Sequence, residues 1–405
     1  MNRSGGDADV TRAAMLAHLG TSGGASRADL ARALGLSPAL VSQTVKQLMA
    51  EGLVRELETS TSSGGRPGRL LGVASTALRS VGLKVSHDHV ALVETELDGS
   101  VVRAVTLRFD AASVTFLSDL VGLVRAFIGD GRDEPILGIG VGVPGAVDAT
   151  GTGVVDSGML GWRQAPLGAL MARELDVPVL VENNVNALAV AERLYGAGRE
   201  HENFLVITIG EGVGAGVVVG GEVVRGSRGG AGEIGHITAL SDGPLCTCGK
   251  RGCIEALAGE KALLGKARGA GVVPAGGEMA QLQRAADSGN PNARAIYALA
   301  ASKLGEVVAS LVQFIDPEVV IISGEGTKAW THWSIPFEQA LRAGITVDRR
   351  AIPVIVEDWE DEAWARGAAA LVASTPFDVA GTFGEQGRRV RARLMTGSSA
   401  TEAAS

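Results

Sequence analysis

The first 60 residues place apolar side chains at helical spacing and separate them with start and stop signals. The segment VTRAAMLAHL, residues 10–19, carries its apolar residues on one helical face. After a glycine-rich break, Ser26 and Asp29 have the spacing of a capping box, which opens a second helix. Gly35 ends that helix, because glycine tolerates the left-handed backbone found at helix C-termini.

A third helix is predicted directly after this turn. Ser37 is its N-cap and Pro38 its first residue. One face of this helix is apolar, and the other carries small, amide and cationic side chains, namely Ala39, Ser42, Gln43 and Lys46. Two capped helices around a tight turn are typical of a helix-turn-helix, whose second helix enters the major groove of DNA. We therefore expect Ser37 and the polar face of this helix to contact DNA.

The residues that follow predict a wing. Leu53-Val54-Arg55 reads as a strand, and TSSGGRPGRLLGV, residues 61–73, as a loop that runs into a second strand. Arg66 lies in a Gly-Arg-Pro tripeptide that resembles the hooks with which proteins insert an arginine into a narrow minor groove. Arg69 is expected to contact DNA as well. A helical bundle with a merely solvated polar face is the competing interpretation; we favour a winged helix-turn-helix domain in residues 1–75.

From residue 78 the pattern changes to aliphatic strands that alternate with helices. Residues 81–102 read as a hairpin with Asp98-Gly99 at a turn. Further buried strands are predicted within residues 136–147, 178–183, 204–224 and 317–326. This alternation predicts an α/β domain, residues 76–373, with ligand chemistry at the carboxyl ends of parallel strands. Residues 374–405 lose the periodicity and are expected to be disordered, with RRVRAR as a solvated basic run.

The charge is divided unevenly between these domains. The whole chain has a formal charge of −8, but residues 1–75 hold eight Lys and Arg against six Asp and Glu, so this segment is +2 and the remainder is −10. The balance excludes a nucleic-acid surface over the whole protein and agrees with DNA contact through the head. We expect no apolar run to span a bilayer and no signal peptide. A cytoplasmic protein without a membrane partner is predicted, associated with the nucleoid when it is bound to DNA.

The most specific stretch is GEIGHITALSDGPLCTCGKRGCIE, residues 232–255, which contains every cysteine of the chain. His236 is followed by Cys246, Cys248 and Cys253. One imidazole and three thiolates form a tetrahedral set suited to structural Zn²⁺, with no coordination position left for catalysis. The alternative is a cluster of buried thiols without a metal. We favour zinc, which would fix the directions of the flanking Glu233 and Glu255.

These motifs resemble the ROK family of sugar kinases and sugar-responsive repressors. The resemblance rests on GEIGH, on the Cys-x-Cys-Gly-x-x-Gly-Cys-x-Glu run, on GVPGAV, on Glu-Asn-x-x-Asn, on ISGEG and on RGAAAL. It implies a two-lobed, actin-like fold of the hexokinase type with a sugar in the cleft. It also implies that sugar hydroxyls are held by Asn183, Asn184, Glu233, His236 and Glu255.

The chain departs from the kinase pattern of this family. Asn184 stands where active members have the aspartate that takes a proton from the sugar, and an amide cannot act as that base. The first phosphate loop is replaced by residues 84–88, Lys-Val-Ser-His-Asp. In the second loop Glu211 stands in place of threonine, and the adenosine segment has Ser323-Gly324 in place of two glycines.

The winged head followed by Gly-Arg-Pro resembles the repressor branch of the family, since its kinases usually lack such a head. We therefore expect a sugar-responsive transcriptional regulator, most simply a repressor, without kinase activity. Its expected partners are a palindromic operator, a sugar or sugar derivative, and a second copy in a homodimer or a dimer of dimers. Two alternatives remain open, namely a bifunctional ATP-dependent sugar kinase with a DNA-binding head, and a regulator that responds to a protein partner or to metal occupancy.

Overall fold

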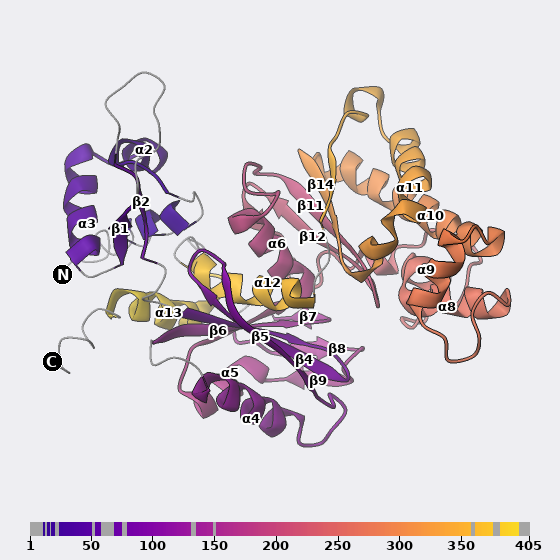
Figure 1. Ribbon diagram of the computed structural model, residues 1–405, viewed down its shortest axis with the longest axis horizontal. Coiled ribbons are helices and arrows are strands. Elements are labelled where there is room, and N and C mark those ends of the chain that lie inside the picture. Colours follow the sequence, from indigo (N-terminus) through magenta and orange to yellow (C-terminus); the bar gives the residue numbers. More distant parts are fainter. Residues whose placement is uncertain are drawn as a thin grey trace. The chain divides into compact units, whose positions relative to one another are not determined.

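The computed structural model of the 405-residue chain divides into two compact units. The first comprises residues 1–199, 227–229 and 361–405, and the second comprises residues 200–226 and 230–360 (Figure 1). The structure describes residues 11–12, 14–16, 18–20, 24–50, 53–57, 69–74, 79–130, 135–148, 151–357, 361–375 and 381–396.

The head of the first unit is the predicted winged helix-turn-helix. Helices α2 (Arg27–Ala33) and α3 (Pro38–Ala50) are followed by strands β1 (Val54–Glu56) and β2 (Leu71–Val73), which pair antiparallel. The predicted capping box is present, since the Ser26 side chain accepts from the backbone N–H of Asp29 and the Asp29 carboxylate accepts from that of Ser26. The hydrophobic core of the head consists of buried apolar residues: Met15, Leu16, Leu19, Leu30, Val41, Val45, Leu48 and Leu71.

The main sheet of the first unit has five strands in the order β10-β6-β3-β4-β5. Strands β3 and β4 pair antiparallel, as do β4 and β5, whereas β6 pairs parallel with both β3 and β10. The strands are β3 (Arg79–Val85), β4 (His89–Glu96), β5 (Val101–Arg108), β6 (Ile136–Val143) and β10 (Val179–Asn183).

The main sheet of the second unit repeats this arrangement. Its order is β13-β12-β11-β14-β15, and again the first three strands in the chain are antiparallel neighbours while β14 lies parallel to β11 and β15. The strands are β11 (Phe204–Ile209), β12 (Val213–Val219), β13 (Glu222–Val223), β14 (Val319–Ser323) and β15 (Val354–Val356). Two sheets of one topology confirm the two-lobed α/β architecture.

Helices cover these sheets and join their strands (Figure 1). The first unit also holds a small sheet of β7 (Ala146–Val147), β8 (Val155–Ser157) and β9 (Trp162–Ala165), with helices α4 (Phe116–Gly129), α5 (Leu167–Leu175), α6 (Asn184–Tyr195) and α12 (Asp361–Ser374). The second unit holds α7 (Glu255–Ala258), α8 (Glu260–Gly269), α9 (Met279–Asp287), α10 (Pro291–Ile315) and α11 (Trp330–Gly344), with 3-10 turns η1 (Ile234–His236), η2 (Glu325–Ala329) and η3 (Val347–Arg349).

Helix α12 returns the chain to the first unit and lies directly on its sheet, on the face opposite to α4 and α5 (Figure 1). Its small residues permit this contact. A Cβ added to Gly82 of β3 would overlap the Ala365 carbonyl oxygen, and one added to Gly140 of β6 would overlap that of Ala368. On its other side Gly367 approaches the backbone of α6 to 3.1 Å from an ideal Cβ position. Glycines in the strands and in α12 are therefore needed for helix and sheet to meet at this distance.

The expectation of a disordered tail after residue 374 is corrected by helix α13 (Gly384–Thr396). Val390 and Leu394 on this helix are buried, and Arg393 donates to the backbone carbonyls of Ile136 and Asp176. The arginines that made the segment appear solvated thus anchor it to the first unit, together with a short apolar face. Residues 376–380 and 397–405 of the predicted tail lie outside the described residues.

One helix, α10 (Pro291–Ile315), is long and apolar enough to cross a membrane by length and composition, contrary to the expectation that no segment reaches this length. The structure gives it a different role. Tyr297, Leu304 and Val308 on α10 are fully buried within the core of the second unit. Its apolar character is explained by this central position.

The contact between α12 and the sheet gives a first prediction. Gly140→Ala should destabilise the protein by about 1–3 kcal/mol, because the new methyl group overlaps backbone that cannot move without shifting the helix. The matched control is Gly122→Ala in the exposed part of α4, where an added Cβ meets no atom within 4 Å; it should be neutral or stabilising by about 0.5–1 kcal/mol. Urea denaturation of the two variants measures the difference, and equal stabilities would contradict the packing argument.

Candidate functional site

The exposed face of α3 carries the side chains predicted to contact DNA. Ala39, Ser42, Gln43 and Lys46 are all exposed, while Val41, Thr44, Val45 and Leu48 are buried. Ser37 is also exposed, and its hydroxyl accepts from the backbone N–H of Leu40 at 3.3 Å. The structure thus separates a packed face from a face of amide, hydroxyl and ammonium groups, which are the donors and acceptors that read base edges and phosphates.

The wing is described only at its base. Arg69 is largely exposed and pairs with Glu56 on the neighbouring strand, 2.5 Å apart. This ion pair holds Arg69 on the wing when no DNA is bound. Arg66 lies outside the described residues, so its predicted minor-groove role stays a prediction.

His236, Cys246, Cys248 and Cys253 form one cluster in the second unit. Their ligand atoms all lie within 4.8 Å of one another. His236 Nδ1 is 3.5 Å from Cys246 Sγ, and the Sγ atoms of Cys248 and Cys253 are 3.7 Å apart. A tetrahedral ion with bonds of about 2.3 Å to sulfur and about 2.0 Å to nitrogen needs S···S and N···S separations of about 3.8 and 3.5 Å. These two separations match such an ion, and the four side chains lie close enough together to hold one.

The loop backbone explains why the four side chains converge. Gly249 and Gly252 adopt φ of +87° and +72°, a left-handed conformation that other residues rarely adopt. The turn is closed by hydrogen bonds from Cys246 N–H to the Lys250 carbonyl at 2.8 Å and from Gly249 N–H to the Cys246 carbonyl at 3.0 Å. The Lys250 ammonium donates to the His236 carbonyl at 2.7 Å, which ties the two parts of the ligand set together.

The electrostatics of this cluster favour a cation. Burial, together with the neighbouring Cys248 and Cys246, raises the pKa of the Cys253 thiol to about 12. A backbone hydrogen bond from Lys250 lowers the pKa of the exposed Cys248 thiol, so the two thiols that lie 3.7 Å apart are shifted in opposite directions. A divalent ion would lower the pKa of Cys253, because a metal ion stabilises the thiolate and the proton is released to solvent.

Glu233 and Glu255 flank the cluster within the second unit. Glu233 immediately precedes η1, which ends at His236, and Glu255 opens α7 two residues after Cys253. Loss of hydration raises the pKa of Glu233, with Glu255 raising it and His236 lowering it. The metal loop thus positions two carboxylates and an imidazole together, a combination that accepts from and donates to vicinal hydroxyl groups.

Asn183 and Asn184 lie at the predicted place, where β10 ends and α6 begins. Asn183 is the N-cap of α6, since its Oδ1 accepts from the N–H groups of Val185 at 2.8 Å and Asn186 at 3.2 Å. Its Nδ2 donates to the Gly145 carbonyl at 2.9 Å. The amide predicted to hold a sugar is therefore first a structural cap, with one N–H left for a ligand.

Asn184 is the half-buried first residue of α6. An ideal Cβ on Gly142 of β6 would lie 3.5 Å from the Asn184 Cα, so Asn184 is held beside the end of a second strand. The cap of α6 is made by the Asn183 side chain, so the Asn184 side chain is not required for it. Of the two amides, Asn184 is thus the better placed to bind a ligand.

Sequence reasoning did not assign a role to Glu182, which the structure places under these amides. Its buried carboxylate accepts from the Asn183 N–H at 2.8 Å and from Asn186 Nδ2 at 3.1 Å. The sequence does carry a signal for Glu182. It is a carboxylate within a buried strand, four residues before an amide on the following helix. Glu182 fixes the turn from which Asn183 and Asn184 project.

Comparison with known proteins decides the family. The model described as ROK family matches residues 81–375, which is more than half of the chain. The chain belongs to the ROK family. A MarR family model matches residues 9–64, the segment of the winged head, so the head is a MarR-type winged helix joined to a ROK domain.

Individual relatives include regulators and kinases. The xylose repressor of Bacillus subtilis (strain 168) is 36% identical over 242 residues, which cover 59% of this chain. The match spans 63% of the length of that protein, which is less than two thirds. A solved ROK family transcriptional regulator, a homologue of the E. coli MLC protein, has a TM-score of 0.79 with 23% identity and covers 95% of this chain and 99% of its own. At this level of sequence identity, the comparison with the solved regulator shows only that the fold is shared.

A ROK family glucokinase from Streptomyces griseus, solved with glucose and AMPPNP, has a TM-score of 0.64 with 26% identity and covers 72% of this chain and 98% of its own. Both branches of the ROK family are therefore similar to this chain. The residues at the expected nucleotide positions are what distinguish them.

The turn between β11 and β12 is the expected second phosphate loop of the ROK domain. It is closed by a hydrogen bond from Gly210 N–H to the Gly212 carbonyl at 3.0 Å. The Glu325 carboxylate lies where a Cβ on Gly210 would be, and a Glu255 carboxylate oxygen lies 3.0 Å from the Cβ position of Gly212. With Glu211 at the tip, carboxylates surround the loop, and these would repel phosphate groups.

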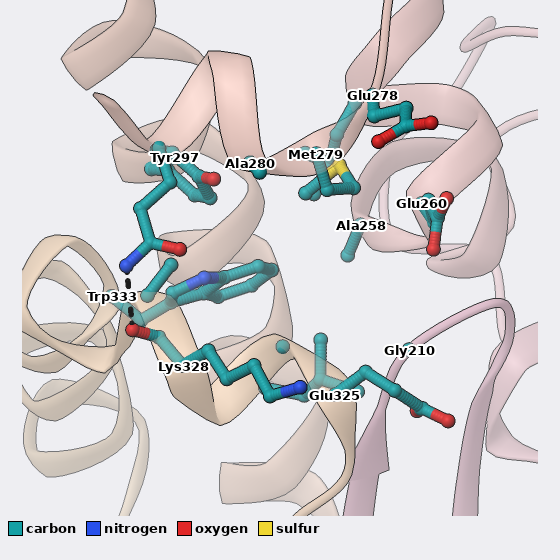
Figure 2. A pocket seen from close by; sticks show the side chains of 15 residues that line it. Gly210, Ala258, Glu260, Glu278, Met279, Ala280, Tyr297, Glu325, Lys328 and Trp333 are labelled. Atoms are coloured by element: carbon teal, nitrogen blue, oxygen red, sulfur yellow. Dashed lines mark hydrogen bonds between the residues drawn. The ribbon is translucent and has the colours of Figure 1, made fainter. Parts of the chain in front are cut away.

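A pocket with a volume of about 460 Å³ adjoins this loop within the second unit (Figure 2). Glu260, Glu278 and Glu325 line it, with Lys328 as the one cation among its lining residues. Burial raises the pKa of Glu260, and Glu211, Glu325 and Glu278 raise it further. The pocket is therefore negative on the side where a nucleotide would place its phosphates.

The two amides give a second prediction, which separates cap from ligand contact. Asn183→Ala should lower the free energy of unfolding by about 1 kcal/mol, because three backbone groups lose their partner. Asn184→Ala should change it by less than about 0.5 kcal/mol, because that side chain caps nothing. Denaturant unfolding of both variants measures the contrast. A larger loss for Asn184→Ala than for Asn183→Ala would contradict these assignments.

Proposed function

We propose that this ROK protein is a transcriptional repressor that binds operator DNA through its MarR-type head and binds a sugar through its ROK domain without phosphorylating it. The observation that carries the proposal is Glu211, which stands at the tip of the expected phosphate loop where the kinases have threonine, beside the carboxylates of Glu255 and Glu325 that already lie against this loop. A kinase needs cationic or backbone donors at this place. A sensor of sugars does not.

The head supplies the DNA-binding half of the proposal. The exposed Gln43 and Lys46 of α3 are suited to base and phosphate contacts. Arg69, two residues before β2, and Arg66 in the predicted wing add positive charge. Arg66 is proposed to contact the minor groove. Ser37, Ala39 and Ser42 complete the surface predicted to face the DNA.

The ROK domain supplies the effector half. The residues that we assign to the binding of sugar hydroxyls are Asn183, Asn184, Glu233, His236 and Glu255. Carboxylates and amides are the groups that bind vicinal hydroxyls. Because the Bacillus subtilis relative is named a xylose repressor, a pentose is the first sugar to test.

The rival function, a bifunctional kinase, lacks support at the reacting position. Asn184 cannot accept the proton of a sugar hydroxyl as an aspartate does. The β3–β4 turn, Ser86-His87-Asp88, offers a carboxylate paired with His89 at 2.7 Å where the kinase pattern has glycines and threonine. Loss of both the base and the phosphate contacts opposes phosphoryl transfer.

We assign structural zinc to His236, Cys246, Cys248 and Cys253. Four protein ligands leave no open position for catalysis, so the ion would act by holding the loop and by orienting Glu233 and Glu255. His236 would bind the ion through Nδ1, the nitrogen that faces Cys246. Its other nitrogen then stays available to donate to a sugar hydroxyl.

Regulation requires that the sugar bind two states of the protein with different affinity, one of which fits the operator better. We propose a homodimer, which the repressor function needs for a palindromic operator, with a dimer of dimers as a further assembly. The protein would act in the cytoplasm, at the nucleoid.

The metal assignment gives a third prediction. Purified protein should contain about one equivalent of zinc per chain, and Cys253→Ser should lose most of it because a hydroxyl is a poor zinc ligand. The variant should also lose affinity for the sugar, since the loop no longer directs Glu233 and Glu255. Elemental analysis and calorimetry measure these two effects. Thr247→Ala, in the same loop but outside the ligand set, is the control that should keep its metal, and zinc-free wild-type protein would refute the site.

The DNA and sugar functions are tested together in a fourth prediction. Fluorescence anisotropy with DNA from upstream of the protein's own gene should detect specific binding, which xylose or another neutral sugar alters. Lys46→Ala should weaken DNA binding about three- to tenfold and reduce the salt dependence by about one counterion. Lys303→Ala, which removes the same charge from the exposed surface of α10, should leave it unchanged.

Two outcomes would overturn the proposed function. The first is ATP-dependent phosphorylation of a sugar by the wild-type protein that is lost in Asn184→Ala, which would establish a kinase. The second is the absence of any effect of neutral sugars on stability or DNA binding, which would favour regulation by a protein partner or by metal occupancy. Asn184→Asp is expected to change sugar affinity without introducing phosphoryl transfer, since the carboxylates around Gly210 remain.

A further inference from the structure

The pocket beside Gly210 combines its acidic side with a second feature that the proposed function does not use. It lies entirely within the second unit, between the end of β11, helices α8 to α11 and the η2 turn (Figure 2). One side is acidic. The other side holds two polar atoms that have no partner.

The acidic side consists of Glu260 at the start of α8, Glu278 before α9 and Glu325 at the start of η2. Figure 2 shows Glu260 and Glu278 on one side of the pocket, with Glu325 extending from the opposite wall toward the Gly210 loop. Lys328 balances one of these three charges. The lining residues therefore keep an excess of negative charge that attracts a cation.

The two partnerless atoms are the Tyr297 hydroxyl and the Trp333 indole N–H. Both side chains are fully buried, and neither atom has a hydrogen-bond partner among the described residues. Figure 2 shows the Tyr297 hydroxyl directed into the space above the Trp333 ring. Buried donors without partners are rare in folded proteins, and an indole N–H can only donate. Each therefore points to a ligand that brings an acceptor oxygen.

Burial, with Asp287 nearby, raises the pKa of the Tyr297 hydroxyl far above its ordinary value. It is thus neutral at physiological pH and can both donate and accept. Hydroxyl groups on the ligand suit both atoms chemically, because a hydroxyl can accept from the Trp333 N–H and can exchange a hydrogen bond with Tyr297. Between the two polar sides Leu263, Met279 and the Trp333 ring supply an apolar wall for a carbon skeleton.

Two other ligand classes fit less well. Phosphates would face Glu325 and Glu260 without a compensating set of cations. A single metal ion needs closely spaced ligand atoms, and among the described residues the one group of His, Cys, Asp and Glu that is compact enough is the His236 cluster. The carboxylates of the pocket are spread more widely, as an extended organic cation requires.

We propose that this pocket is a second ligand site, which takes a small primary amine that also carries hydroxyl groups, of the amino-sugar or amino-alcohol class. The ammonium group pairs with Glu260 and its neighbouring carboxylates, and a hydroxyl reaches Tyr297 and Trp333. The site is separate from the sugar residues Glu233, His236 and Glu255, so its occupation does not depend on the proposed function.

The test compares a cationic probe with its neutral counterpart. Isothermal titration calorimetry of the full chain with D-glucosamine and with D-glucose should give tighter binding of the amine. Glu260→Gln should weaken glucosamine binding by about tenfold or more, because it removes a charged acceptor. Glu306→Gln, the same change on the exposed surface of α10, should leave it unchanged.

Tyr297→Phe examines the other end of the site. It should weaken glucosamine binding about fivefold, which corresponds to one neutral hydrogen bond. The melting temperature of the free variant should be equal to or above that of the wild type, because the removed hydroxyl has no partner in the free protein. A lower melting temperature with unchanged glucosamine affinity would mean that the hydroxyl is structural, and would overturn its role as a ligand contact.

The sugar site is distinguished by Glu233→Gln. This variant should lose binding of the neutral effector sugar and retain glucosamine binding that is sensitive to Glu260→Gln. Loss of glucosamine binding in Glu233→Gln together with no effect of Glu260→Gln would place the amine at the sugar site and refute the second site. Equal affinity of glucose and glucosamine at the pocket would refute its preference for a cation.

Discussion

The close contact of α12 with the first sheet and with α6 is the constraint on which the first unit depends. Gly82 and Gly140 have no side chain, so the backbone of α12 can contact the sheet directly. Gly367 likewise allows the close approach of α6 on the other side of α12. Helix α6 carries Asn183 and Asn184 at its start. A segment more than 150 residues later in the chain thus sets where these two amides stand, and the carboxylate of Glu182 beneath them sets their backbone.

The second unit applies the same topology to a different chemistry. Its order of strands repeats that of the first unit, yet the turn between its first two strands is surrounded by carboxylates where a kinase binds phosphates. Electrostatic repulsion acts over several ångströms and is strengthened by partial burial, so a few glutamates suffice to change what the pocket accepts. In the proposed function, this fold therefore binds sugar hydroxyls without phosphoryl transfer.

In the proposed function, the Cys-rich loop connects structure with effector recognition. The separations from His236 Nδ1 to Cys246 Sγ and from Cys248 Sγ to Cys253 Sγ match those of a tetrahedral ion. Glu233 lies just before one ligand and Glu255 just after another. A site of this kind gives two flexible carboxylates a fixed direction at low cost in conformational entropy, which is the requirement for discriminating one sugar from another.

The sequence alone determined the features that depend on local signals: the capping box at Ser26 and Asp29, the polar face of α3, the ligand set at His236 and the cysteines, and the alternation of strands and helices. These features depend on the spacing of residues that are close to one another in the sequence. Only the tertiary structure assigned α13 as an ordered helix, because its short apolar face and its arginine contacts to Ile136 and Asp176 have meaning only beside β6. It alone also showed that Asn183 is occupied as a cap and that Glu325 covers Gly210, since both depend on which distant residues become neighbours.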